Sequence, residues 1–146
     1  MNATATAPAR PSGHTWQSVG AIVAGALVGL VLELSTDSML RAAGVFPPLD
    51  QPMPMRNSLL LIATVYRTIY GVLGAYVAAR LAPNRPMRHA LILGAIGFAV
   101  SVLGTVVTWN SGPAFGPHWY PIALDVLAMP QSWVGGKLRE SQLSGK

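Results

Sequence analysis

Four charged side chains interrupt the long apolar stretches of the sequence, and their types could support chemistry inside a membrane. They are Glu33, Asp37, Arg67 and Asp125. A charge near the centre of a membrane helix costs about 2.5–3.5 kcal/mol on insertion. Each of the four is therefore expected to face protein or water, where carboxylates and a guanidinium could hold a proton, an ion or a small polar solute.

The spacing of these residues predicts a single charged layer. Asp37 follows Glu33 by one helical turn and so shares its face. At 1.5 Å per residue, Glu33 and Asp125 lie roughly 9 Å inside the expected outer boundary of the membrane, and Arg67 lies roughly 12 Å inside it. A guanidinium has five N–H donors and can serve two carboxylates. We therefore predict that Arg67 bridges Glu33 and Asp125, with Asp37 near the mouth of the site.

Several uncharged polar residues and one histidine are expected to complete this layer. They are Tyr66, Tyr70, Ser101, Thr105, Thr108 and His118. Three interpretations of the layer stay open. It is either a polar, outward-facing cavity for a proton, an ion or a small solute, or a buried charge network that only fixes how the helices pack. The third is that some of the charges, Asp37 first among them, extend to the membrane interface.

Signatures of catalysis and of cofactor or metal binding are missing from the sequence. There is no HExxH, GxSxG or phosphate-loop motif. The three histidines fall in separate connecting segments and the chain has no cysteine, so no metal site and no cofactor are expected. We predict that the protein is not an enzyme. The remote exception is a membrane enzyme acting on lipid or quinone, which only the aromatic residues near the outer surface suggest.

The composition predicts an all-α integral membrane protein. Apolar residues make up 51% of the chain and charged residues only 10%, against roughly 25% charged residues in soluble domains. Four apolar segments each approach the ~20 residues that span a ~30 Å hydrocarbon layer, which predicts a four-helix bundle. The fourth segment is the weakest, because Asp125, Pro130 and Gln131 dilute it. The expected helices are 17–42, 57–81, 89–109 and 120–138.

The chain ends and the basic residues predict domain limits and orientation. Residues 1–15 are expected to form a disordered cytoplasmic tail, residues 16–140 the membrane domain, and residues 141–146 a second cytoplasmic tail. Arginine and lysine concentrate on the side of the termini, which the positive-inside rule assigns to the cytoplasm. That side carries Arg10, Arg80, Arg85, Arg88, Lys137, Arg139 and Lys146, and the other side carries Arg41 and Arg56. The net charge of +5 is therefore ascribed to membrane topology, and no nucleic acid is expected as a partner.

A weak internal repeat relates the two halves of the chain. Residues 76–81 read YVAARL and residues 133–138 read WVGGKL, so both give an aromatic residue, Val, two small residues, a base and Leu. Two parallel helical hairpins would follow from a true repeat. The alternative is that membrane helices commonly share small residues and end in bases. Stripes of small residues on three segments fit packing within the chain or a homo-oligomer. They are Ala21, Gly25 and Gly29; Gly71, Ala75 and Ala79; and Gly97, Ser101 and Thr105.

One long stretch carries a resemblance to a known group of proteins. Residues 64–97, TVYRTIYGVLGAYVAARLAPNRPMRHALILGAIG, together with GPHWYP at 116–121 and WVGGKLRE at 133–140, resemble a family of small bacterial four-helix inner-membrane proteins. The family has no known activity, so the resemblance transfers no functional residue. It implies a multi-pass protein of the bacterial inner membrane.

These observations favour a non-catalytic membrane subunit or accessory protein, because no motif specifies a reaction. The expected partners are the lipid bilayer and a further copy of the chain or a larger membrane protein. The alternative is a small transporter or permease for a proton, an ion or a small solute, acting through the charged layer.

Overall fold

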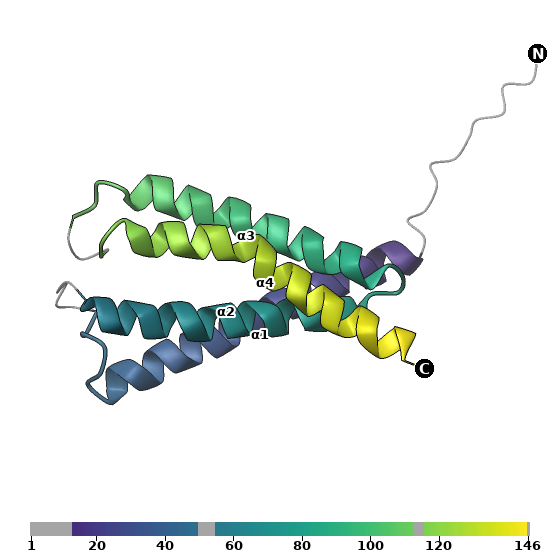
Figure 1. Ribbon diagram of the computed structural model, residues 1–146, viewed down its shortest axis with the longest axis horizontal. Helices are drawn as coiled ribbons and strands as arrows, with labels where there is room; N and C mark the ends of the chain where they lie inside the picture. The colour runs from purple at the N-terminus through teal and green to yellow at the C-terminus, as the bar shows by residue number, and fades with distance from the viewer. Residues whose placement is uncertain (1–12, 50–54, 113–115, 146) are drawn as a thin grey trace, which may run out of the picture.

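The computed structural model describes residues 13–49, 55–112 and 116–145, and within these ranges the regular secondary structure is all α-helical. The four helices are α1 (Gly13–Ala42), α2 (Asn57–Leu81), α3 (Pro86–Thr108) and α4 (Trp119–Ser144). They run alternately up and down, so α1 begins and α4 ends at the same end of the molecule (Figure 1). We call this the termini end. The opposite end, where α1 connects to α2 and α3 to α4, is the loop end.

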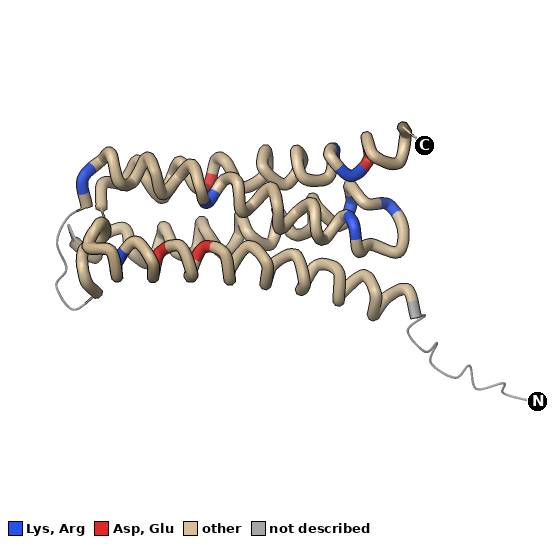
Figure 2. Tube along the Cα trace, turned by 90° about the horizontal axis from the view of Figure 1, so that it is seen from below, with Lys and Arg blue, Asp and Glu red and all other residues tan. Residues whose placement is uncertain are grey.

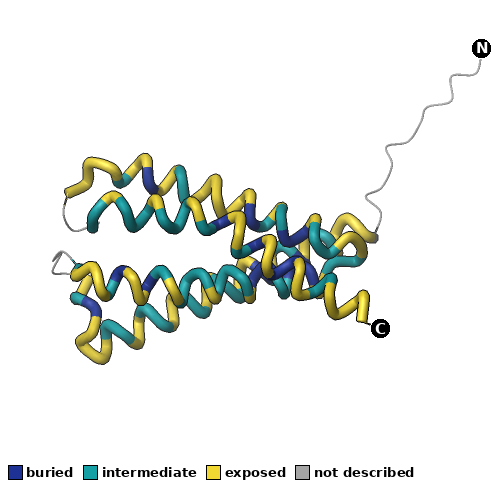
Figure 3. The backbone as a smooth tube through the Cα atoms, viewed as in Figure 1, coloured by how far each residue is buried: buried dark blue, intermediate teal, exposed yellow. Residues whose placement is uncertain are grey.

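Three helices are long and apolar enough to cross a membrane, which confirms three of the four expected spans. They are His14–Ala42, Asn57–Leu81 and Pro86–Thr108. On α1, Val23, Leu27, Leu30 and Leu34 share the outward face and are between 49 and 58% exposed. Figure 3 shows such exposed residues along the outside of the helices. Exposed large apolar side chains in this number fit a lipid environment, because water would oppose their exposure.

The helix limits differ from the expected ones mainly at polar segments. α2 has the expected bounds. α1 already begins at Gly13, inside the expected tail, while residues 1–12 lie outside the described part. α3 begins at Pro86, because proline fits the first turn of a helix. α4 continues to Ser144, where a Lys137–Glu140 pair at 3.0 Å supports its polar end, which hydropathy alone does not reveal.

Small residues bring the helices closest together in the half near the termini end. Ala75, Ala79 and Ala90 form the buried core there. A Cβ atom added to Gly74 of α2 would lie 2.7 Å from the carbonyl oxygen of Gly25 in α1. A Cβ atom added to Gly135 of α4 would lie 2.7 Å from the Cβ of Ala75. Two of the expected small-residue stripes are thus used for packing within the chain.

In each helical hairpin, a glycine on the first helix lies where the two helices approach closely. Gly25 of α1 and Gly94 of α3 both lie against two small residues spaced four apart on the following helix. The partners are Gly74 and Ala78 in the first hairpin, and Ala128 and Ser132 in the second. A true repeat would place the contact residues of α2 and α4 at equivalent positions. When residues 76–81 are aligned with 133–138, Gly74 and Ala78 fall about one helical turn after Ala128 and Ser132. The repeat therefore stays a prediction.

Candidate functional site

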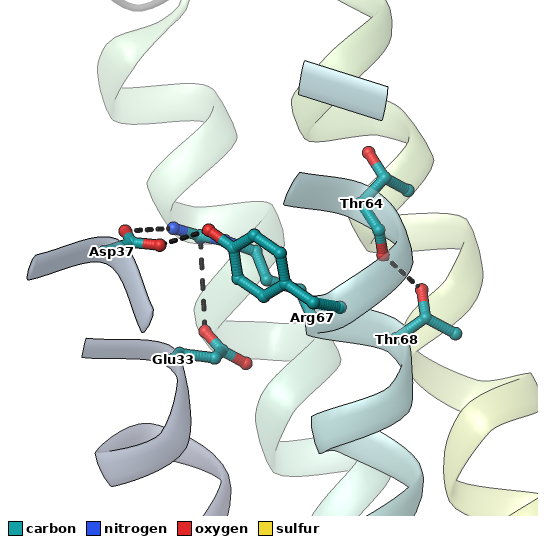
Figure 4. A network of polar contacts seen from close by, with 6 residues as sticks. Glu33, Asp37, Thr64, Arg67 and Thr68 are labelled. Carbon is teal, nitrogen blue, oxygen red and sulfur yellow. Dashed lines mark hydrogen bonds and ion pairs between the residues drawn. The ribbon is translucent and has the colours of Figure 1, made fainter. Parts of the chain in front are cut away.

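The charged layer is centred on Arg67 of α2, which binds two carboxylates of α1 (Figure 4). Its Nη2 donates a hydrogen bond of 2.7 Å to Oδ2 of Asp37. Its Nη1 lies 4.0 Å from Oε2 of Glu33, which is a looser ion pair. The predicted Arg67–Glu33 pair is present, but Asp37 is the closer partner instead of a residue near the mouth.

Asp125 does not take part in this ion pair, so the predicted bridge from Arg67 to Asp125 is wrong. Its carboxylate accepts hydrogen bonds from two hydroxyls of α3 instead. Ser101 Oγ donates to Oδ1, and Thr105 Oγ1 donates to Oδ2 at 3.0 Å. The estimated depth of Asp125 in the membrane could not reveal this partner. Depth does not say which neighbouring helix a side chain faces, and here the packing of α4 against α3 turns Asp125 toward α3.

Two tyrosines strengthen the contact between α1 and α2. The Tyr66 hydroxyl donates to Oδ1 of Asp37, so that this carboxylate binds a tyrosine and an arginine together. The Tyr70 hydroxyl lies 2.9 Å from Oγ1 of Thr36. Thr36 was missed by the sequence argument, although it lies about one turn from Glu33 on the same face. Polar pairs thus join these two helices over more than one turn.

The threonines on α2 beside Arg67 contribute less to the layer. The hydroxyl of Thr68 donates to the carbonyl oxygen of Thr64 at 2.7 Å, and that of Thr64 donates to the carbonyl oxygen of Leu60 at 2.8 Å. Both hydroxyls are therefore satisfied by their own helix. They add no contact to the carboxylates.

A cavity of about 540 Å³ lies between the four helices and is walled partly by the charged layer. Glu33 and Arg67 stand on its wall, and glycine and apolar residues form most of the remainder. The Nε of Arg67 is buried and has no hydrogen-bond partner in the described part of the chain. The other polar lining residues are Tyr70, Ser101, Gln131 and Ser132. Of these, Gln131 and Ser132 were not among the predicted site residues; a glutamine within an apolar segment was the available signal.

A second pocket of about 420 Å³ lies at the loop end. Thr105, Thr108 and His118 line it. Thr108 and His118, which were expected in the charged layer, therefore belong to this pocket and not to the group of residues around Arg67. The His118 ring stacks on Trp109 with 4.1 Å between ring centroids, and its Nε2 lies 3.1 Å from the Trp109 carbonyl oxygen. Gly112 takes a positive φ of 95° in this loop, which glycine adopts without strain.

The electrostatic balance of the layer is negative. The layer holds three carboxylates and one guanidinium, and the guanidinium is bound by the two carboxylates of α1. Within the described ranges, no group of three or more His, Cys, Asp or Glu residues is placed to hold a metal ion. The arrangement suits the binding of a proton, a monovalent cation or a small polar molecule in a mostly apolar setting.

Comparison with known proteins adds no further assignment. No family model matches the chain, and no curated protein and no solved structure is similar to it.

Proposed function

We propose that the chain is a small multi-pass membrane protein that binds a small solute or ion in the cavity between its helices and moves it across the bilayer. The observation that carries this is the cavity of about 540 Å³ with the ion-paired Arg67 and Glu33 on its wall. A network serving only to fix helix packing would need no such space beside its charges.

The proposal includes α4 as a fourth crossing, in a bundle of four membrane helices. α4 packs along α2 and α3 and runs antiparallel to α3. Ile122, Val126, Met129 and Trp133 repeat every three or four residues and are exposed. This spacing puts one apolar face toward lipid. Its polar residues lower its hydropathy, and three of them, Asp125, Gln131 and Ser132, face α3 or the cavity.

The bilayer is proposed to be a bacterial inner membrane, with both chain termini in the cytoplasm. The family resemblance supports the compartment. The distribution of basic residues supports the orientation, because positive charge gathers at the termini end (Figure 2). In the described ranges that end carries Arg80, Arg85, Arg88, Lys137 and Arg139, while the loop end carries Arg41 and Arg56. The loop-end pocket then opens to the outside.

Flux through proteoliposomes tests the proposal. Indicator dyes trapped inside report H⁺, Na⁺ and K⁺, and light scattering reports the entry of small neutral solutes. A Cβ at Gly97 meets no atom within 4 Å, and Gly97 lines the cavity. The Gly97→Leu substitution should therefore fill the cavity and abolish the flux without disturbing the fold.

Gly104 provides the matched control, since a Cβ there also meets open space and the residue lines neither hollow. Gly104→Leu should leave the flux unchanged. Arg67→Ala should abolish it. An absence of flux over the whole panel, or a flux that survives Gly97→Leu, would contradict the proposal.

A non-catalytic subunit is the second candidate, and one feature of α3 favours it. Gly104 is exposed and meets no neighbouring atom where a Cβ would stand, so a helix of another protein or of a second copy could approach α3 closely there. In that case the protein should co-purify with its partner, or form a stable homo-oligomer in mild detergent. A monodisperse monomer, with no crosslinked partner in cells, would count against it.

A further inference from the structure

The carboxylate of Asp125 lies between the two hollows of the molecule. One of its oxygens accepts a hydrogen bond from Ser101, which lines the cavity between the helices. The other accepts from Thr105, which lines the loop-end pocket. Thr105 is only 8% exposed, so its side chain is buried. A single carboxylate is therefore bonded to the wall of both hollows.

In the part of the chain that the structure describes, the Asp125 carboxylate has no positively charged partner, because no nitrogen of Lys, Arg or His lies within 4.0 Å of its oxygens. Arg67, the single basic residue of the layer, is bound to Asp37 at 2.7 Å. An ionised carboxylate that is taken out of water needs a counter-charge as well as hydrogen bonds. The two hydroxyls supply only the hydrogen bonds.

The surrounding helices increase the excess of negative charge. α3 offers only hydroxyls at this level, since its basic residues Arg88 and His89 stand at the termini end. The titratable groups on the other helices of the layer are Glu33 and Asp37 of α1, Tyr66, Arg67 and Tyr70 of α2, and Tyr120 of α4. These groups put two further carboxylates and one guanidinium in the same layer as Asp125.

We propose that Asp125, Ser101 and Thr105 form a binding site for Na⁺. Carboxylate and hydroxyl oxygens are the ligands that hard cations prefer. A hydroxyl that now donates to the carboxylate can rotate and offer its lone pairs to the cation.

The position of the site suggests how it is filled. Thr105 lines the loop-end pocket and Ser101 lines the cavity, so a cation would enter past one of these two hydroxyls, since Asp125 itself lines neither hollow. Binding here is separate from the Arg67 pair, and it does not depend on any solute being moved. A protein that binds the cation without transport would therefore refute the proposed permease and leave this inference intact.

Calorimetric titration of the purified full-length protein in lipid nanodiscs tests the site. Titration with NaCl, against choline chloride at the same ionic strength, reports Na⁺ binding. We expect a Na⁺-specific heat, and we expect Asp125→Asn to remove it.

Variants that keep the carboxylate test the site even where Asp125→Asn does not fold. Thr105→Val and Ser101→Ala each remove one hydroxyl and should weaken Na⁺ binding about tenfold. Thr108→Val is the matched control, because the Thr108 hydroxyl donates to the Gly104 carbonyl oxygen and not to Asp125. The absence of a Na⁺-specific heat in the wild type, a heat that persists in a folded Asp125→Asn variant, or equal effects of Thr105→Val and Thr108→Val would overturn the proposal.

Discussion

Removing the charge of Asp37 should destabilise the fold far more than removing the charge of Glu33. The two residues lie on the same face of α1 and share Arg67, but their distances to it are 2.7 and 4.0 Å. Asp37 also accepts a hydrogen bond from Tyr66, whereas Glu33 makes no hydrogen bond in the described part of the chain. Asp37→Asn and Glu33→Gln keep the side-chain size, remove the charge and replace one acceptor oxygen by an NH₂ donor.

The distances set the expected magnitudes. With an effective dielectric constant of about 20, the attraction of two unit charges is about 6 kcal/mol at 2.7 Å and about 4 kcal/mol at 4.0 Å, before desolvation offsets much of both. Hydrogen bonds to charged groups contribute about 1.5–3 kcal/mol net. We therefore expect Asp37→Asn to lower the free energy of unfolding by about 2–3 kcal/mol. Glu33→Gln should lower it by less than about 1 kcal/mol, because this looser pair is about one-third exposed.

Unfolding by sodium dodecyl sulfate in mixed micelles, followed by helical circular dichroism, measures both values. Glu140→Gln serves as the control, since Glu140 pairs with Lys137 on the exposed end of α4 and its loss should cost under about 1 kcal/mol. Equal losses for Asp37→Asn and Glu33→Gln, or a larger loss for Glu33→Gln, would refute the reasoning from these distances.

Three further outcomes follow from the packing and the topology. Gly135→Ala should destabilise the protein by about 1–3 kcal/mol because its Cβ would collide with α2, whereas Gly104→Ala should be neutral or stabilise by up to about 1 kcal/mol in the same unfolding assay. Tyr70→Phe removes the hydrogen bond to α1 and should cost about 0.5–1.5 kcal/mol; an unchanged unfolding curve would contradict this. The chain has no cysteine, so an impermeant maleimide added to intact spheroplasts should label Ser111→Cys and spare Ser144→Cys, and the reverse pattern would invert the proposed orientation.

Part of the charged layer followed from the sequence. Charges are rare in membrane helices, so Arg67 and the carboxylates stood out from composition alone, and Arg67 and Glu33 do lie together. The sequence did not reveal which residues bind the Asp125 carboxylate. Helical periodicity gives the angle between residues on one helix, but it does not say which neighbouring helix a given face meets. Asp125 meets hydroxyls of α3, and Asp37 takes the position nearest to Arg67.

The sequence by itself determined the helices and their suitability for a membrane. Hydrophobic length and the prolines between the segments place the helices, and three of the expected spans satisfy length and hydropathy in the structure. These are local properties, because each membrane helix satisfies its own backbone hydrogen bonds. The tertiary structure decided the cavity between the helices, the pocket at the loop end and the pairing of each charge. Those depend on how closely the helices approach at Gly25, Gly74 and Gly135, which is set by the mutual fit of side chains far apart in the chain.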